Sequence, residues 1–212
     1  MSKKKSPYSF KRIWNLIKHG LILQGMRHGL AKIGIDIMPY YWVQEEVERS
    51  DEPKLRTEEQ RFEFVSLNDL EIEQIKTKSD SISENKIIDS INDGQECVGL
   101  RHHGDIAAYM FIKLNNFTFK NREFILNDNE AYLLNMFTFD AFRGKNLAPY
   151  LRHLCYRYLE VKGIDLKYSV SNYFNKSAIR FKQKLNSKSL KLLVHIELFK
   201  SLRWHFVLRN FK

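Results

Sequence analysis

The stretch that decides the fold is Phe139-Asp140-Ala141-Phe142-Arg143-Gly144-Lys145-Asn146-Leu147-Ala148-Pro149-Tyr150. Residues 131–139 are nearly all apolar, as expected of a central strand that is buried on both faces. Residues 147–162 repeat apolar side chains at helical spacing and are followed by Gly163, which suits a helix C-cap. A strand, a short basic turn with a glycine and a helix predict an anion site, because N–H groups and the helix dipole converge at the helix start.

Composition bounds the class of protein. The chain has 212 residues, 43% hydrophobic and 13% aromatic, which is enough for a folded core. The net charge of +10 favours anionic partners such as nucleotides, nucleic acid or acidic lipid. Cys97 and Cys155 have no metal-binding or redox spacing, so we expect reduced core thiols in a cytoplasmic protein. No apolar run reaches the roughly 20 residues of a membrane span.

Two parts are expected, a basic arm with an acidic linker at 1–60 and the main domain at 61–212. Residues 1–34 carry basic side chains and no acidic one, in a pattern of amphipathic helices broken by glycines. This arm has two interpretations: it packs on the domain, or it touches acidic membrane or a partner protein. Residues 39–43, Pro-Tyr-Tyr-Trp-Val, are expected to form an aromatic packing plug, and the acidic linker 45–59 follows.

The main domain is predicted to mix strands and helices. Hairpins dominate, with one crossover through the 147–162 helix, which indicates an α+β fold with a mixed, mostly antiparallel central sheet flanked by helices, plus an N-terminal helical extension. Residues 115–129 are predicted to be a long loop or an irregular strand, and the adjacent His102 and His103 lack a third ligand, so no metal site is expected. Strands are expected at 62–67, 96–100, 106–114, 131–139, 164–170, 190–196 and 202–211, and helices at 69–76, 84–91, 147–162 and 174–185.

From about residue 62 to 211, this order of elements resembles the GNAT acyltransferase superfamily, and two motifs carry the resemblance. The family's pyrophosphate-binding pattern is Arg/Gln-x-x-Gly-x-Gly/Ala, which residues 143–148 match except at Asn146. Asn tolerates the left-handed backbone better than other non-glycine residues, so we expect the turn to survive the exchange. Pro149 suits the first helical turn but removes one amide that a phosphate could use.

The second motif is at residues 175–185, Asn-Lys-Ser-Ala-Ile-Arg-Phe-Lys-Gln-Lys-Leu. It resembles the family's Asn-x-x-Ala…Tyr-x-Lys-x-Gly-Phe segment, in which the Asn binds the cofactor arm. Lys182 replaces the frequent Tyr, a proton donor to the leaving thiolate, and Asn186-Ser187 replace the closing Gly-Phe pair.

The resemblance implies acetyl-CoA as the donor, a primary amine as the usual acceptor and no metal. Residues 141–212 hold 16 Lys and Arg against three acidic residues, a charge excess that suits the phosphates of CoA. The family pattern assigns the pantetheine to Met136, Phe137 and Thr138, the pyrophosphate to Arg143, Gly144, Lys145, Asn146, Leu147 and Ala148, and the cofactor arm to Asn175.

Direct transfer needs a base that makes the amine neutral and a donor for the oxyanion, which we expect from a strand N–H near Phe137 or Thr138. Tyr132 occupies the place nearest the family's common glutamate, and Glu130 lies two residues away on the same strand face. Glu130 is the candidate base, with a solvated strand-end carboxylate as the alternative interpretation. Lys182 is a candidate proton donor or a phosphate contact.

Two other functions stay open on the sequence alone. One is a degenerate GNAT fold that binds CoA or tethers a partner without turnover, motivated by the replaced Tyr and Gly-Phe and by the basic arm. The other is a basic nucleic-acid-binding module, although the chain has no recognisable nucleic-acid-reading motif. The sequence does not indicate the acceptor or the oligomeric state.

Overall fold

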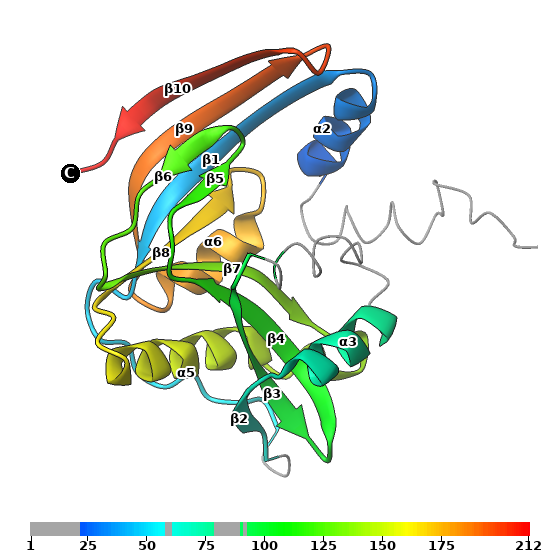
Figure 1. Cartoon of the computed structure of the whole chain (residues 1–212), viewed down its shortest axis with the longest axis vertical. Helices are drawn as coiled ribbons and strands as arrows, with labels where there is room; N and C mark the ends of the chain where they lie inside the picture. The colour runs from blue at the N-terminus through cyan, green and yellow to red at the C-terminus, as the bar shows by residue number, and fades with distance from the viewer. Residues whose placement is uncertain (1–21, 58–60, 79–89, 91–92) are drawn as a thin grey trace, which may run out of the picture. The chain divides into compact units, whose positions relative to one another are not determined.

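The computed structural model describes residues 22–57, 61–78, 90 and 93–212. Most of the basic arm and the helix expected at 84–91 lie outside the described residues. The backbone forms two units, which are coloured by residue number in Figure 1 and described one at a time below. Unit 1 contains the described residues up to Val43, Val170–Gln183 and Ser189–Lys212, and unit 2 contains Gln44–Ser169 and Lys184–Lys188. The expected division into 1–60 and 61–212 stays a prediction.

Unit 2 holds a sheet with the strand order β8-β7-β4-β3-β2. All neighbouring strands pair antiparallel except β7 and β8, which are parallel. The predicted α+β fold with a mostly antiparallel sheet is therefore confirmed. The strands are β2 Glu63–Ser66, β3 Glu96–His102, β4 Asp105–Lys113, β7 Glu130–Thr138 and β8 Leu166–Asn172, of which the last part belongs to unit 1.

Two helices pack on this sheet. α3 (Asp69–Lys78) begins with a capping box, in which Asn68 and Glu71 each accept the other's backbone N–H at 3.0 Å. α5 (Leu147–Val161) packs against β3, β4 and β7, and Gly163 follows it with φ 78° as expected of a C-cap. A short 3-10 turn, η1 (Asp140–Phe142), precedes α5.

The two thiols of the chain are inert parts of unit 2. Cys97 and Cys155 are free and buried, as the sequence predicted. Burial raises the pKa of both, that of Cys155 to about 12, so neither thiol ionises near neutral pH.

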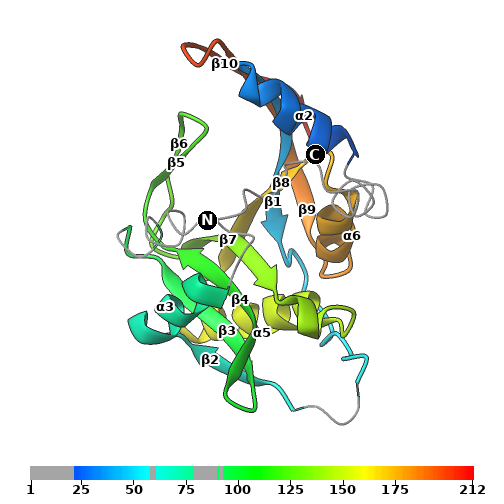
Figure 2. The ribbon, with the colours of Figure 1, turned by 90° about the vertical axis from the view of Figure 1, so that its right-hand side faces the viewer.

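Residues 115–129 differ from the prediction. They contain a regular hairpin of β5 (Phe117–Phe119) and β6 (Arg122–Phe124), visible in Figure 2 as a separate two-stranded projection. Lys120 and Asn121 at its tip both have positive φ, 52° and 61°, as in a type I′ turn. The prediction followed the polar composition of the segment, whereas its interspersed phenylalanines order the hairpin: Phe117 is buried and stacks on Phe124 across the two strands.

Unit 1 contains strands in the order β10-β9-β1-β8. The burial of Tyr40 and Val43 agrees with the expected packing of residues 39–43, but these residues lie within an 11-residue strand, which the sequence did not predict. The predicted closing hairpin is confirmed by the antiparallel pairing of β9 and β10. The elements are α2 Ile22–Lys32, β1 Ile35–Glu45, α6 Lys176–Gln183, β9 Lys188–Leu198 and β10 Leu202–Asn210.

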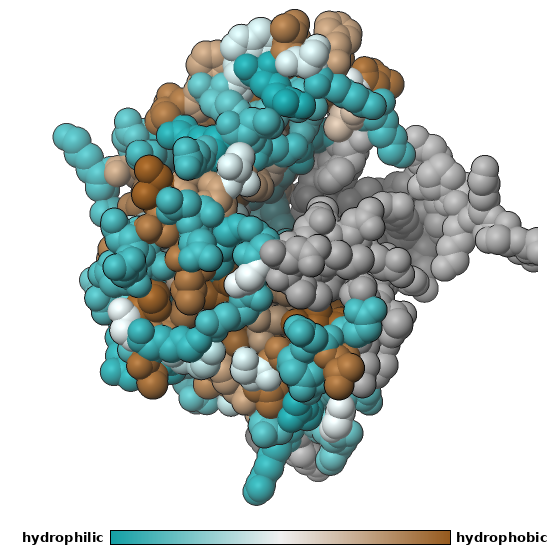
Figure 3. All heavy atoms as spheres, viewed as in Figure 1, coloured by the Kyte–Doolittle hydropathy of each residue, from teal (hydrophilic) through white to brown (hydrophobic). Residues whose placement is uncertain are grey.

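The surface of unit 1 is partly apolar. Leu202, Trp204, Phe206 and Leu208 of β10 are exposed. Figure 3 shows hydrophobic side chains among hydrophilic ones on the visible face. In the part of the chain that the structure describes, no helix is long and apolar enough to cross a membrane.

Candidate functional site

A β-bulge interrupts β7, the strand that leads into the opening loop. The register against β4 shifts between Leu134 and Phe137, so that Asn135 and Met136 lie opposite the single residue Met110. Asn135 has φ 50°, outside the extended range of a strand. A bulge leaves one residue out of the ladder, and its backbone groups become available to a ligand. This bulge lies in the strand segment expected to hold the pantetheine.

The other side of β7 is open over the same segment. The parallel ladder joins Glu130–Tyr132 to Leu166–Tyr168. Beyond Tyr132, residues 133–138 have no ladder partner on β8 within the described chain. Unpaired strand edges accept extended ligands by main-chain hydrogen bonds. The predicted pantetheine residues, 136–138, lie beyond the end of this ladder, although the carbonyl oxygen of Thr138 accepts a hydrogen bond from Arg143 Nε.

The loop between β7 and α5 turns through two left-handed residues, Gly144 with φ 85° and Asn146 with φ 66°. Asn146 adopts the left-handed backbone that the sequence analysis expected an asparagine to tolerate here. Its side-chain amide donates to the carbonyl oxygen of Lys54 at 2.8 Å. The backbone N–H of Arg56 donates to the carbonyl oxygen of Lys145 at 3.1 Å. The linker segment therefore holds the loop in place.

Two cations flank this loop. Arg143 Nε donates to the carbonyl oxygen of Thr138 at 3.2 Å, and Nη2 lies 2.8 Å from the Asp140 carboxylate. The Arg143 side chain is nevertheless 55% exposed, so its remaining donors face solvent. Lys145 Nζ lies 5.3 Å from the ring centroid of Phe142.

The start of α5 fits an anion. Its first turn holds no acidic residue, and the N-terminal amides carry the positive end of the helix dipole. Even an added Cβ at Gly144 would meet no atom within 4 Å, so this part of the loop is open to a ligand. The residues from Gly144 to Ala148 thus suit a pyrophosphate, although Pro149 contributes no N–H.

Glu130, the candidate base, is a buried carboxylate with two partners. It is 8% exposed, its Oε2 accepts the backbone N–H of Asn127 at 3.0 Å, and its Oε1 accepts the Tyr168 hydroxyl at 3.2 Å. The pKa of Tyr168 is raised by burial first and by the Glu130 charge second. The alternative interpretation of a solvated carboxylate is therefore wrong, while the role of base stays a prediction.

The remaining predicted residues divide between the two units. Tyr132 in unit 2 is buried and stacks on Phe117, with ring centroids 4.0 Å apart. In unit 1, Asn175 Oδ1 accepts the N–H of Ala178 at 3.1 Å and so caps α6. Lys182 Nζ is buried and donates to Ser171 Oγ at 2.9 Å. The structure brings the β7 and loop residues together in unit 2, whereas Asn175 and Lys182 belong to unit 1.

An ionic network that the sequence did not predict joins α5 to Glu45 and Glu46. Tyr156 on α5 donates its hydroxyl to Glu45 Oε2 at 2.5 Å, and Arg152 Nε lies 3.4 Å from the same oxygen. Glu46 pairs with Arg157 and, at 3.6 Å, with Lys167. The charged residues Arg152 and Arg157 within the otherwise apolar helix α5 were the signal in the sequence that could have indicated buried ion pairs. The partners of Tyr156 and Arg157 lie 111 residues away in sequence, so the pairing itself could not be inferred.

This network connects α5 to the linker that starts at Glu45. Lys54 and Arg56 of the same linker bond the loop between β7 and α5. Burial and the neighbouring Glu45 raise the pKa of Tyr156 well above its ordinary value, so the phenol remains a hydrogen-bond donor. His153 Nδ1 lies 3.3 Å from Ser50 Oγ, and burial lowers the pKa of this imidazole. Among the described residues, no three His, Cys, Asp or Glu side chains gather where they could hold a metal ion.

No protein-family model and no curated protein matches the chain. Solved structures do match. A putative GNAT-family acetyltransferase from Novosphingobium aromaticivorans is 18% identical, with a TM-score of 0.55 over 80% of this chain and 67% of that one. A GNAT-family acetyltransferase from Colwellia psychrerythraea is 13% identical, with a TM-score of 0.57 over 84% and 62%. A GCN5-related N-acetyltransferase from Kribbella flavida is 14% identical, with a TM-score of 0.51 over 82% and 63%.

The likeness at these identities concerns the fold. The chain shares the α+β architecture of these acetyltransferases and spans about two thirds of the length of each. The bulged strand, the basic loop and the helix that follows it occur in the order expected of that architecture. The protein therefore has the GNAT fold.

Proposed function

We propose that this protein is an N-acetyltransferase that moves an acetyl group from acetyl-CoA to a primary amine by direct transfer. The observation that carries the proposal is the left-handed Asn146 at the start of α5, directly after a bulged strand with an open edge. The loop supports a pyrophosphate, and the open edge of β7 supports an extended pantetheine arm. The excess of basic residues after residue 141 favours the same anionic ligand.

The chemistry requires little covalent participation by the protein. The amine nitrogen attacks the thioester carbonyl, a C–N bond forms, the C–S bond breaks, and CoA leaves as a thiolate. One proton lost by the amine ends on the base or on the thiolate. A backbone N–H at the bulge, near Met136 and Phe137, is suited to stabilise the oxyanion of the tetrahedral intermediate. Positioning of the two substrates supplies much of the acceleration.

Calorimetric titration with acetyl-CoA tests the cofactor site. Arg143→Glu reverses a charge at the loop and places two carboxylates side by side with Asp140, so we expect affinity to fall about 100-fold, since each charge-assisted bond lost is worth roughly one tenfold step or more. Arg122→Glu is the matched control, with the same charge change on β6 of the same unit, and should retain affinity. Failure of the unaltered chain to bind acetyl-CoA would contradict the proposal.

A second candidate is a CoA-binding protein without turnover. It is favoured by the engagement of the candidate proton-transfer groups, because Glu130 bonds Asn127 and Tyr168, and Lys182 bonds Ser171. The two functions differ in one measurement. Release of free CoA thiol in the presence of a panel of primary amines supports the enzyme, whereas tight acetyl-CoA binding without thiol release across the panel supports the binding protein.

A further inference from the structure

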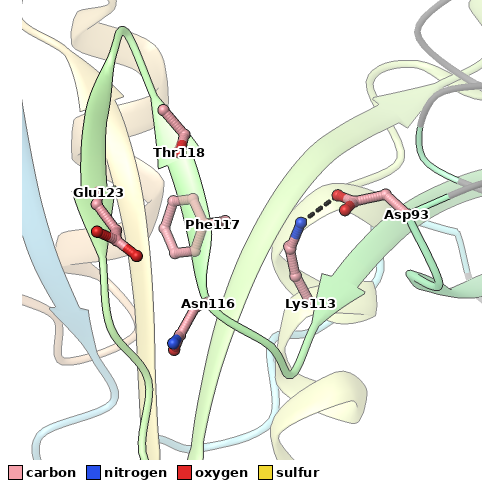
Figure 4. Close-up of a pocket in the computed structure, with 6 residues that line it drawn as sticks. All are labelled: Asp93, Lys113, Asn116, Phe117, Thr118 and Glu123. Atoms are coloured by element: carbon pink, nitrogen blue, oxygen red, sulfur yellow. Dashed lines mark hydrogen bonds and ion pairs between the residues drawn. The ribbon is translucent and has the colours of Figure 1, made fainter.

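A polar pocket of about 400 Å³ lies beside the first part of β7, within unit 2 (Figure 4). It is a hollow open to solvent, bordered by the end of β4, the turn before β3 and the β5–β6 hairpin, whose two strands the sequence did not predict. The volume falls within the range of small-molecule sites, roughly 300–1,000 Å³. Its lining residues are Asp93, Lys113, Asn116, Phe117, Thr118 and Glu123.

The pocket borders the strand that organises the proposed site. Lys113 is the ladder partner of Tyr132, and Phe117 stacks on the Tyr132 ring at 4.0 Å. The bulge at Asn135 lies three residues further along β7, or about 10 Å at the usual rise of a strand. The anion-binding loop follows the opposite end of the same strand. A donor held by the loop and a second substrate held in the pocket would thus approach the bulge from opposite ends of β7.

The charge of the pocket is opposite to that of the chain. Lys113 is 6% exposed and pairs with Asp93, and its hydrogen bond is the largest cause that lowers the pKa of that carboxyl. This pair is internally neutral. Glu123, an exposed residue of β6, adds a second carboxylate to the lining. In a protein of net charge +10, this pocket therefore favours a cation over an anion.

The other lining groups are suited to a hydroxylated ligand. Asn116 accepts the N–H of Leu126 at 2.9 Å through its carbonyl oxygen, which leaves the amide N–H₂ available as a donor. Thr118 and Glu123 are cross-strand partners on the hairpin, so their side chains lie on one face of it. A purely apolar ligand would bury these groups without partners, at a cost in affinity.

We infer that this pocket binds the acceptor, and that the acceptor is a small primary amine that carries hydroxyl groups, such as an amino sugar. Before the donor is engaged, the cationic amine pairs with Glu123, and the hydroxyl groups exchange hydrogen bonds with Asn116, Thr118 and the Lys113–Asp93 pair. For transfer, the amine gives its proton to the base and leaves Glu123 to reach the thioester at the bulge. The assignment of this ligand as an acceptor rests on the proposed function, while its binding does not. The inserted hairpin accordingly sets the specificity for the amine.

The test is a calorimetric titration of the full chain with three probes: glucosamine, glucose and cyclohexylamine. Glucosamine has both the charge and the hydroxyl groups, glucose lacks the amine, and cyclohexylamine lacks the hydroxyl groups. We expect glucosamine to bind at least about tenfold more tightly than either, the size of one lost charge-assisted bond. Glu123→Gln should weaken glucosamine binding about tenfold, because it removes the charge and preserves the shape.

Asp128→Asn is the matched control, since it makes the same charge change at an exposed residue outside the pocket. Equal thermal unfolding of both variants excludes a folding defect. The inference is overturned if glucosamine does not bind, if the three probes bind alike, or if Glu123→Gln and Asp128→Asn have the same effect.

A parallel titration with acetyl-CoA separates the two proposals. Binding of acetyl-CoA without Glu123-dependent binding of glucosamine overturns the pocket assignment alone. Glu123-dependent binding of glucosamine without acetyl-CoA binding supports the pocket and overturns the proposed function.

Discussion

Replacement of Asn146 tests the structure of the loop most directly. Asn146 has φ 66° and ψ 25°, and its side chain bonds the Lys54 carbonyl oxygen. Asn146→Val places a β-branched residue in the left-handed region, at a cost of roughly 1–2 kcal/mol, and removes a hydrogen bond worth about 1 kcal/mol. The free energy of unfolding should therefore fall by about 2–3 kcal/mol. Asn146→Gly loses the same hydrogen bond but adopts the conformation without strain, so we expect a loss of about 1 kcal/mol or less.

Urea denaturation with linear extrapolation measures both changes. The same variants predict a difference in cofactor binding, because the loop must keep its shape to present its amides. Asn146→Gly restores the family's glycine and should bind acetyl-CoA within about threefold of the unaltered chain, whereas Asn146→Val should bind at least about tenfold more weakly. Equal unfolding free energies for the two variants would show that Asn146 is not held in the left-handed conformation, and the argument for the pyrophosphate loop would fail with it.

Three further predictions concern the interior of unit 2. Burial lowers the pKa of His153 below its ordinary 6.5, so the folded state favours the neutral imidazole. The free energy of unfolding should therefore decline as the pH falls below about 6.5. His153→Gln should flatten this dependence in urea titrations at pH 5 to 7. Tyr156→Phe removes the donor to the buried Glu45 carboxylate, so the free energy of unfolding should fall by about 1.5–3 kcal/mol, and no change in the denaturation midpoint would contradict the ionic network. Gly99→Ala brings a Cβ to 2.9 Å from the carbonyl oxygen of Ala108, and thermal unfolding should show a loss of about 1–3 kcal/mol unless β3 and β4 separate without cost.

The local elements of the chain followed from its sequence because short-range physics decides them. The helix from Leu147 was predicted within one residue, since apolar side chains recur at helical spacing and Gly163 ends it. The left-handed turn at Asn146 depends on the chemistry of that one residue. The strand at Glu130–Thr138 was predicted, as residues 131–139, from its nearly continuous run of apolar side chains.

The elements that were missed depend on partners that are distant in sequence. The β5–β6 hairpin has only three residues in each strand, and its order comes from the stacking of Phe117 on Tyr132. The strand β1 looked like an aromatic cluster, because its alternating burial exists only within the sheet. The bulge at Asn135 has no signature in composition, since it arises from the register between two strands.

The sequence by itself determined the class of fold, the position of the basic loop between β7 and α5 and the sign of the charge that surrounds it, because these depend on periodicity, turn chemistry and composition. Only the tertiary structure decided that Glu130 is buried and bonded, that Glu45 meets Tyr156, and that an acidic pocket lies beside the first part of β7. Such features require residues far apart in the chain to meet, and the free energy of a buried charge depends on which partners it finds there.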